Sequence, residues 1–94
     1  DIGFVNGGSI RADLTYNPGT LTKRDVLSIL PFNNPVVKVE VTGKVLREIL
    51  EHGVARSAAG EDSEPGRFPQ VSGLSFKFDT TQAAGSRVTE ILVG

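Results

Sequence analysis

The feature that most constrains this chain is an amphipathic segment that runs from Gly43 to about Arg56. Its apolar residues recur every three or four positions, the period of a helix with one buried face. They are Val45, Leu46, Ile49, Leu50 and Val54. Thr42 stands before the segment and is suited to cap the helix. Two oppositely charged pairs are spaced four residues apart and are expected on the solvent side. They are Lys44 with Glu48 and Arg47 with Glu51.

Four segments have the composition of β-strands. Residues 36–41 and 74–79 alternate apolar and polar side chains, which is typical of a half-buried strand. Residues 2–5 and 87–93 are apolar and β-prone. A polar turn region at 80–86 separates the last two strands, so we expect these to pair as a hairpin.

A second, shorter helix is predicted between Thr22 and Leu30. Thr22 is its expected cap, and Asp25 lies in the first turn, where a negative charge suits the helix dipole. Pro31 should end it, because proline disfavours helical geometry in the residue before it. The predicted order is therefore β-α-β-α-β-β, an α+β (mixed α/β) fold with a small sheet of about four strands and two helices. Residues 57–67 are expected to form an exposed loop.

Composition excludes several classes of function. The net charge is −1 without blocks of like charge, which argues against nucleic-acid binding driven by basic residues. The chain has no cysteine and one histidine, so it offers neither a thiolate cluster nor a histidine-based metal site. No apolar run approaches the ~20 residues that a membrane-spanning helix needs. We identify no self-contained catalytic apparatus and expect no metal or cofactor within this chain.

The first candidate site follows the strand at residues 2–5. Gly7 and Gly8 would let backbone N–H groups face an anion, and Arg11 could grip that anion in two places. Asn6 precedes the glycines. The competing interpretation is a plain turn, because two glycines after a strand often form one.

The second candidate site lies between Pro31 and Pro35. Phe32 on so rigid a loop could stack on a nucleobase, and a neighbouring asparagine, Asn33 or Asn34, could hydrogen-bond the edge of that base. The competing interpretation is that Phe32 closes the core beneath the loop, since phenylalanine is usually buried.

Taken together, four motifs resemble the C-terminal domain of the 5'-nucleotidase family. That family includes UDP-sugar hydrolases, 2',3'-cyclic nucleotide phosphodiesterases and animal ecto-5'-nucleotidases. Each motif is ordinary alone, but their order and rough spacing fit over nearly the whole chain. They are NGGSIR at 6–11, LPFNN at 30–34, VTGKVLREILE at 41–51 and GRFPQVSGLSFKFD at 66–79.

The resemblance implies roles for individual residues. Asn6 and Arg11 would contact the phosphate region of a nucleotide, and Gly7 and Gly8 would shape that loop. Phe32 would form one side of an aromatic clamp on the base, and Asn34 would face the base edge. Gly73, which comes just before the strand at 74–79, would also bind substrate and would lie against the same pocket.

The resemblance also implies what lies outside residues 1–94. A partner N-terminal metallophosphoesterase domain would hold two divalent metals of the zinc or manganese type. The second stacking aromatic and further phosphate-binding arginines of the family are not found in this sequence. We therefore expect a fragment, the central part of such a C-terminal domain, that is inactive by itself and belongs to a periplasmic, secreted or cell-surface hydrolase of nucleotides. The alternative is a non-catalytic nucleotide-binding or adhesion module on the same scaffold.

Overall fold

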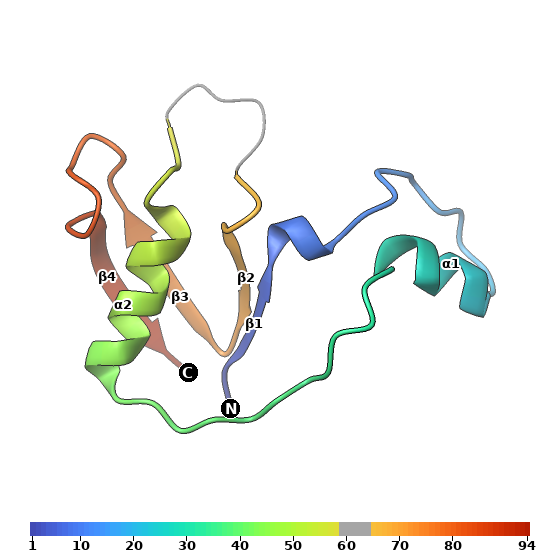
Figure 1. Cartoon of the computed structure of the whole chain (residues 1–94), viewed down its shortest axis with the longest axis horizontal. Helices are drawn as coiled ribbons and strands as arrows, with labels where there is room; N and C mark the ends of the chain where they lie inside the picture. The colour runs from blue at the N-terminus through green and yellow to red at the C-terminus, as the bar shows by residue number, and fades with distance from the viewer. Residues whose placement is uncertain (59–64) are drawn as a thin grey trace.

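The computed structural model describes residues 1–58 and 65–94, and it confirms an α+β fold. The described residues form two helices and four strands, with a short 3-10 turn, η1, after the first strand. Figure 1 shows how these elements are arranged. The strands form two antiparallel pairs, β1 with β2 and β3 with β4. The elements are β1 (Gly3–Asn6), η1 (Gly7–Ser9), α1 (Lys23–Ile29), α2 (Gly43–Val54), β2 (Pro69–Ser72), β3 (Leu74–Phe78) and β4 (Val88–Val93).

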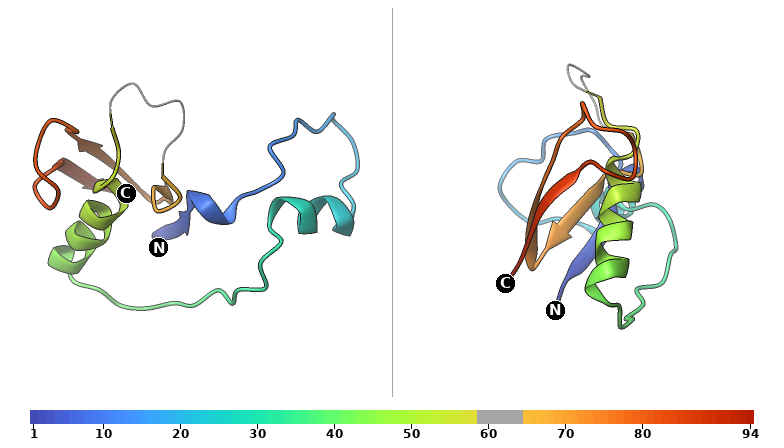
Figure 2. Two further views of the ribbon diagram at one scale, coloured as in Figure 1. Left: turned by 45° about the horizontal axis from the view of Figure 1, so that its top comes forward. Right: turned by 90° about the vertical axis from the view of Figure 1, so that its left-hand side faces the viewer.

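The core lies where α2 packs against the strands. Leu50 and Val54 on the predicted apolar stripe of α2 are 0% exposed. They pack with Leu46 from the same helix, Leu74 from β3 and Val88 from β4. The right-hand view of Figure 2 shows α2 lying along one side of the strands. We call α2 together with β1–β4 the packed layer.

Both helices begin as the sequence predicts. The Oγ1 atom of Thr42 accepts a hydrogen bond from the N–H of Val45 at 3.2 Å. Thr22 and Asp25 form a reciprocal capping box, in which each side chain accepts from the backbone N–H of the other residue. Such caps satisfy N–H groups that a helix leaves unpaired at its start, and each is worth about 1 kcal/mol.

The predicted solvent-side position is wrong for Glu51, whereas Arg47 is exposed as predicted. Glu51 is 8% exposed, and its carboxylate accepts the backbone N–H groups of Arg87 and Val88 at the start of β4. The guanidinium of Arg47 donates to the carbonyl of Val88 at 2.8 Å. The two charged side chains therefore attach α2 to β4 instead of pairing with each other in solvent.

The segment after α2 is attached to the same strand. The Arg87 guanidinium donates to the carbonyls of Val54 at 2.9 Å and Ser57 at 2.8 Å. Ser57 is consequently buried, with 3% of its surface exposed. The predicted exposed loop at 57–67 is thus wrong at its first residue, and its positions 59–64 lie outside the described residues.

The predicted hairpin of the last two strands is confirmed. β3 and β4 pair from Leu74 with Val93 to Phe78 with Val88, and the register shifts between Lys77 and Phe78. In the connecting turn, the Asp79 carboxylate accepts from the side chain and the backbone N–H of Thr81. These two hydrogen bonds favour the ionised form and lower the pKa of the Asp79 carboxyl.

The strand predicted at residues 36–41 is wrong. This segment runs as an extended coil below the packed layer in Figure 1, and none of the described strands pairs with it. Val36, Val37 and Val39 are 100%, 75% and 72% exposed. A period-two pattern forms a strand only where a neighbour completes its hydrogen bonds, and the described residues provide none here.

One strand was not predicted. β2 pairs antiparallel with β1, from Gly3 with Ser72 to Asn6 with Pro69. The observed order is therefore β-α-α-β-β-β instead of β-α-β-α-β-β. Residues 10–42, which we call the arm, leave the packed layer after η1 and return to it at α2 (Figure 1).

Candidate functional site

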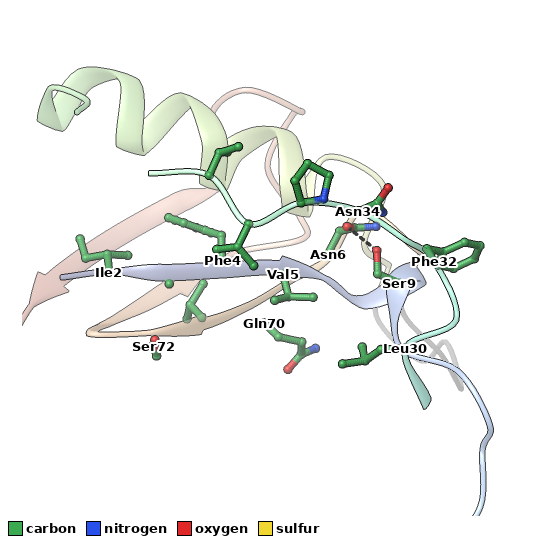
Figure 3. Close-up of a pocket in the computed structure, with 15 residues that line it drawn as sticks. Ile2, Phe4, Val5, Asn6, Ser9, Leu30, Phe32, Asn34, Gln70 and Ser72 are labelled. Carbon is green, nitrogen blue, oxygen red and sulfur yellow. Dashed lines mark hydrogen bonds between the residues drawn. The ribbon is translucent and has the colours of Figure 1, made fainter. Parts of the chain in front are cut away.

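An open cavity of about 740 Å³ lies where the arm passes β1 and β2. Figure 3 shows its lining, with β1 along the cavity and the end of the arm beside it. Its polar and aromatic lining comes from three stretches of the sequence, residues 4–9, 32–34 and 70–72. Three of the predicted site residues belong to it, namely Asn6, Phe32 and Asn34. The other polar or aromatic members are Phe4, Ser9, Gln70 and Ser72.

Asn6 is held in place at the end of β1. Its Nδ2 atom donates to the carbonyl of Gly66 at 3.4 Å, and its Oδ1 atom accepts from the Oγ atom of Ser9 at 2.8 Å. The dashed line in Figure 3 marks the second of these hydrogen bonds. Sequence reasoning did not single out Ser9. The available signal was its place in the turn-forming run from Asn6 to Ser9, because asparagine and serine side chains favour local hydrogen bonds in turns.

Gly7 and Gly8 serve close packing. Their N–H groups donate to the carbonyls of Phe68 and Gly66, each at 2.8 Å. Contrary to the prediction, these N–H groups therefore face the opposite backbone and not an anion. A Cβ atom on Gly8 would lie 3.1 Å from the Cα atom of Gly66, and one on Gly7 would lie 3.2 Å from the Phe68 oxygen. Glycine lets the two backbones approach this closely.

Phe32 lines the cavity and does not close the core. Half of its surface is exposed, at 50%, which contradicts the competing interpretation of a buried ring. The Arg11 guanidinium carbon lies 5.4 Å from the centroid of the Phe32 ring, within the range of a cation–π interaction. Asn34 lines the same cavity, and Figure 3 places it with Phe32 at the end nearest Ser9.

The structure does not place Gly73 in the cavity lining. Gly73 has a φ of +78°, which favours glycine, and a Cβ atom there would overlap the carbonyl oxygen of Asp1. Its neighbour Ser72 lines the cavity instead. In this chain Gly73 therefore permits the tight connection between β2 and β3.

The described residues supply no obvious metal site. Within residues 1–58 and 65–94, no three histidine, aspartate or glutamate side chains gather as metal ligands would. The same part of the chain contains no helix with the length and apolar character needed to cross a membrane. Two aromatic rings and three amides line the cavity, and a cation lies beside one of the rings, an arrangement that suits a planar polar ligand.

With the fold and the cavity described, the comparisons identify the family of this chain. Residues 1–94 match the family described as 5'-nucleotidase, C-terminal domain, and the chain belongs to that family. It is 36% identical over 92 residues to the trifunctional nucleotide phosphoesterase protein YfkN of Bacillus subtilis (strain 168), covering 98% of this chain and 6% of that protein. It is also 36% identical over 92 residues to the snake venom 5'-nucleotidase of Macrovipera lebetinus, covering 96% of this chain and 22% of that protein.

A solved structure supports the same family assignment. The crystal structure of a 5'-nucleotidase precursor from Thermus thermophilus superposes with a TM-score of 0.84 at 40% identity. The match covers 98% of this chain and 17% of that one. The chain thus spans less than a quarter of the length of these relatives.

Proposed function

We propose that this chain is the nucleotide-recognition domain of a metal-dependent 5'-nucleotidase-type hydrolase, which removes phosphate from nucleotides. The observation that carries the proposal is the half-exposed Phe32 ring at a cavity that also presents the Asn34 and Asn6 amides. A flat apolar face beside amide groups matches the two surfaces of a nucleobase, its ring face and its hydrogen-bonding edge.

Each predicted residue has a place in this proposal. The base stacks on Phe32, and the Asn34 amide bonds its edge. Asn6 and Arg11 contact the phosphate region. Gly7 and Gly8 shape the turn that presents Asn6, through their hydrogen bonds to the facing backbone. Gly73 acts at a distance, by holding the β2–β3 connection beside the Ser72 edge of the cavity.

The energetics favour weak binding by residues 1–94 alone. One base–aromatic stack contributes about 1–3 kcal/mol, whereas micromolar affinity requires about 8 kcal/mol.

We also propose that the chain is the central part of its C-terminal domain. A partner N-terminal metallophosphoesterase domain would hold two divalent ions of the zinc or manganese type, as expected of the family that the chain belongs to. Residues 1–94 alone would then be inactive.

We also propose that the full-length protein acts outside the cytoplasm, in the periplasm, at the cell surface or after secretion. The support is the similarity to a 5'-nucleotidase of snake venom.

The test is the substitution Phe32→Ala in the full-length protein, assayed with a nucleoside monophosphate and with a small aryl phosphate. Loss of one stack should raise KM for the nucleotide by roughly 5- to 150-fold and leave the aryl phosphate unchanged. Leu14→Ala is the matched control, because Leu14 is 71% exposed and lies outside the cavity lining. Equal losses on both substrates would contradict a base clamp. Nucleotide binding without any phosphate release would favour the non-catalytic module instead.

A further inference from the structure

The Phe32 ring stands apart from the aromatic pairs of the packed layer. It stands between Pro31 and Pro35 on the arm, and half of its surface is exposed. The aromatic pairs within the described residues are Phe68 with Phe78 and Phe76 with Phe78, so no other ring packs against Phe32 there. A stacking surface works best when its plane is set before the ligand arrives, because ordering a side chain on binding costs free energy.

Arg11 is placed to set that plane. Its backbone N–H donates to the carbonyl of Ile29 at 2.7 Å, which ties the start of the arm to the last residue of α1. Ile29 lies three positions before Phe32 in the sequence, so this hydrogen bond fixes the Arg11 backbone relative to the loop that carries the ring. The guanidinium then lies 5.4 Å from the ring centroid.

The Arg11 side chain has no competing partner in the part of the chain that the structure describes. Neither the side-chain hydrogen bonds nor the ion pairs found within residues 1–58 and 65–94 involve its guanidinium. A planar guanidinium stacks well on an aromatic face. Phe32 lines the cavity, whereas Arg11 does not, so the cation lies outside the cavity lining while the ring borders it.

We propose that Arg11 is a positioning residue for base recognition. Its guanidinium covers one face of Phe32 and holds the ring so that the other face meets the nucleobase, giving a stack of cation, ring and base. This inference rests on the proposed function, and it goes beyond it by assigning Arg11 a contribution to the base as well as to the phosphate. An exposed cation–π contact of this kind corresponds to about a two- to fivefold change in affinity.

The test is a double-mutant cycle of Arg11→Met and Phe32→Ala in the full-length protein. KM is measured for a nucleoside monophosphate and for a small aryl phosphate that lacks a base. A phosphate contact of Arg11 raises both KM values by the same factor. Positioning of Phe32 adds a factor of about two to five for the nucleotide only, and this factor should vanish in the Phe32→Ala background, where no ring remains.

Arg24→Met is the matched control, because Arg24 is an exposed arginine on α1 away from the cavity. It should change neither KM value. Hydrolysis of the aryl phosphate reports that each variant is folded. Equal effects of Arg11→Met on both substrates, or a nucleotide-only factor that persists without Phe32, would overturn the inference. Failure of the proposed function looks different, since Phe32→Ala by itself would then lack a nucleotide-specific effect.

Discussion

The packed layer and the arm contain similar apolar residues, but these are buried in the packed layer and exposed in the arm. In the packed layer, Leu50 and Val54 are 0% exposed. In the arm, Leu14, Leu27 and Val36 are 71%, 53% and 100% exposed. The difference teaches that an apolar pattern predicts burial only where another element covers it. The arm also carries Arg11, Phe32 and Asn34, so the residues proposed for recognition lie in the less packed region, which the packed layer supports.

The largest effect is expected from Leu50→Ala. Leu50 is fully buried between α2 and the strands, so its removal leaves a cavity and should destabilise the chain by about 2–5 kcal/mol. The matched change in the arm, Leu27→Ala, should stay within about 0.5 kcal/mol because that side chain is half exposed. Urea unfolding of the 94-residue chain measures both, and equal losses would break the comparison.

A smaller effect is expected from Glu51→Ala. The substitution leaves the buried N–H groups of Arg87 and Val88 without their acceptor, which should cost about 1–3 kcal/mol. Glu48→Ala on the exposed face of the same helix should change the free energy of unfolding by less than about 0.5 kcal/mol. The midpoint of urea unfolding separates the two variants. An unchanged urea midpoint for Glu51→Ala would mean that the carboxylate does not attach α2 to β4.

The smallest effect is expected from Val39→Thr. Val39 is 72% exposed, so exchanging a methyl group for a hydroxyl of similar size should alter stability by less than about 0.5 kcal/mol. Val54→Thr makes the same exchange at a fully buried position and should cost about 1–3 kcal/mol, because a hydroxyl would be buried there. Thermal unfolding compares the pair. A loss above about 1 kcal/mol at Val39 would show that the arm is covered after all.

Local signals in the sequence predicted the parts of the fold that local interactions determine. Thr22 and Thr42 cap the two helices as expected, and the alternation in residues 74–78 gives the β3 strand of the hairpin. The caps and the apolar stripe depend on residues that are neighbours in sequence, and the hairpin joins two consecutive strands through residues 79–87.

The errors involve contacts between distant residues. β2 begins with Pro69 and is four residues long, so its identity depends on pairing with β1, which lies more than 60 positions earlier. Glu51 looked like a solvent-side charge because its spacing from Arg47 fits an ion pair. Its acceptor role depends on Arg87 and Val88, which local spacing cannot reveal.

The candidate site was predicted in part. The residues themselves indicated an anion loop and an aromatic wall as separate features, and family resemblance joined them. The structure brings Asn6, Phe32 and Asn34 to one cavity. It uses the N–H groups of Gly7 and Gly8 internally, and the contact of Arg11 with Phe32 was not foreseen. That contact depends on the path of the arm, which no local pattern specifies.

The most direct measurement of the central claim is a crystal structure of the full-length protein with a bound nucleoside monophosphate. The account predicts that the base lies flat against the Phe32 ring, with the Asn34 amide at the base edge. A base bound elsewhere, with the Phe32 ring left uncovered, would contradict it.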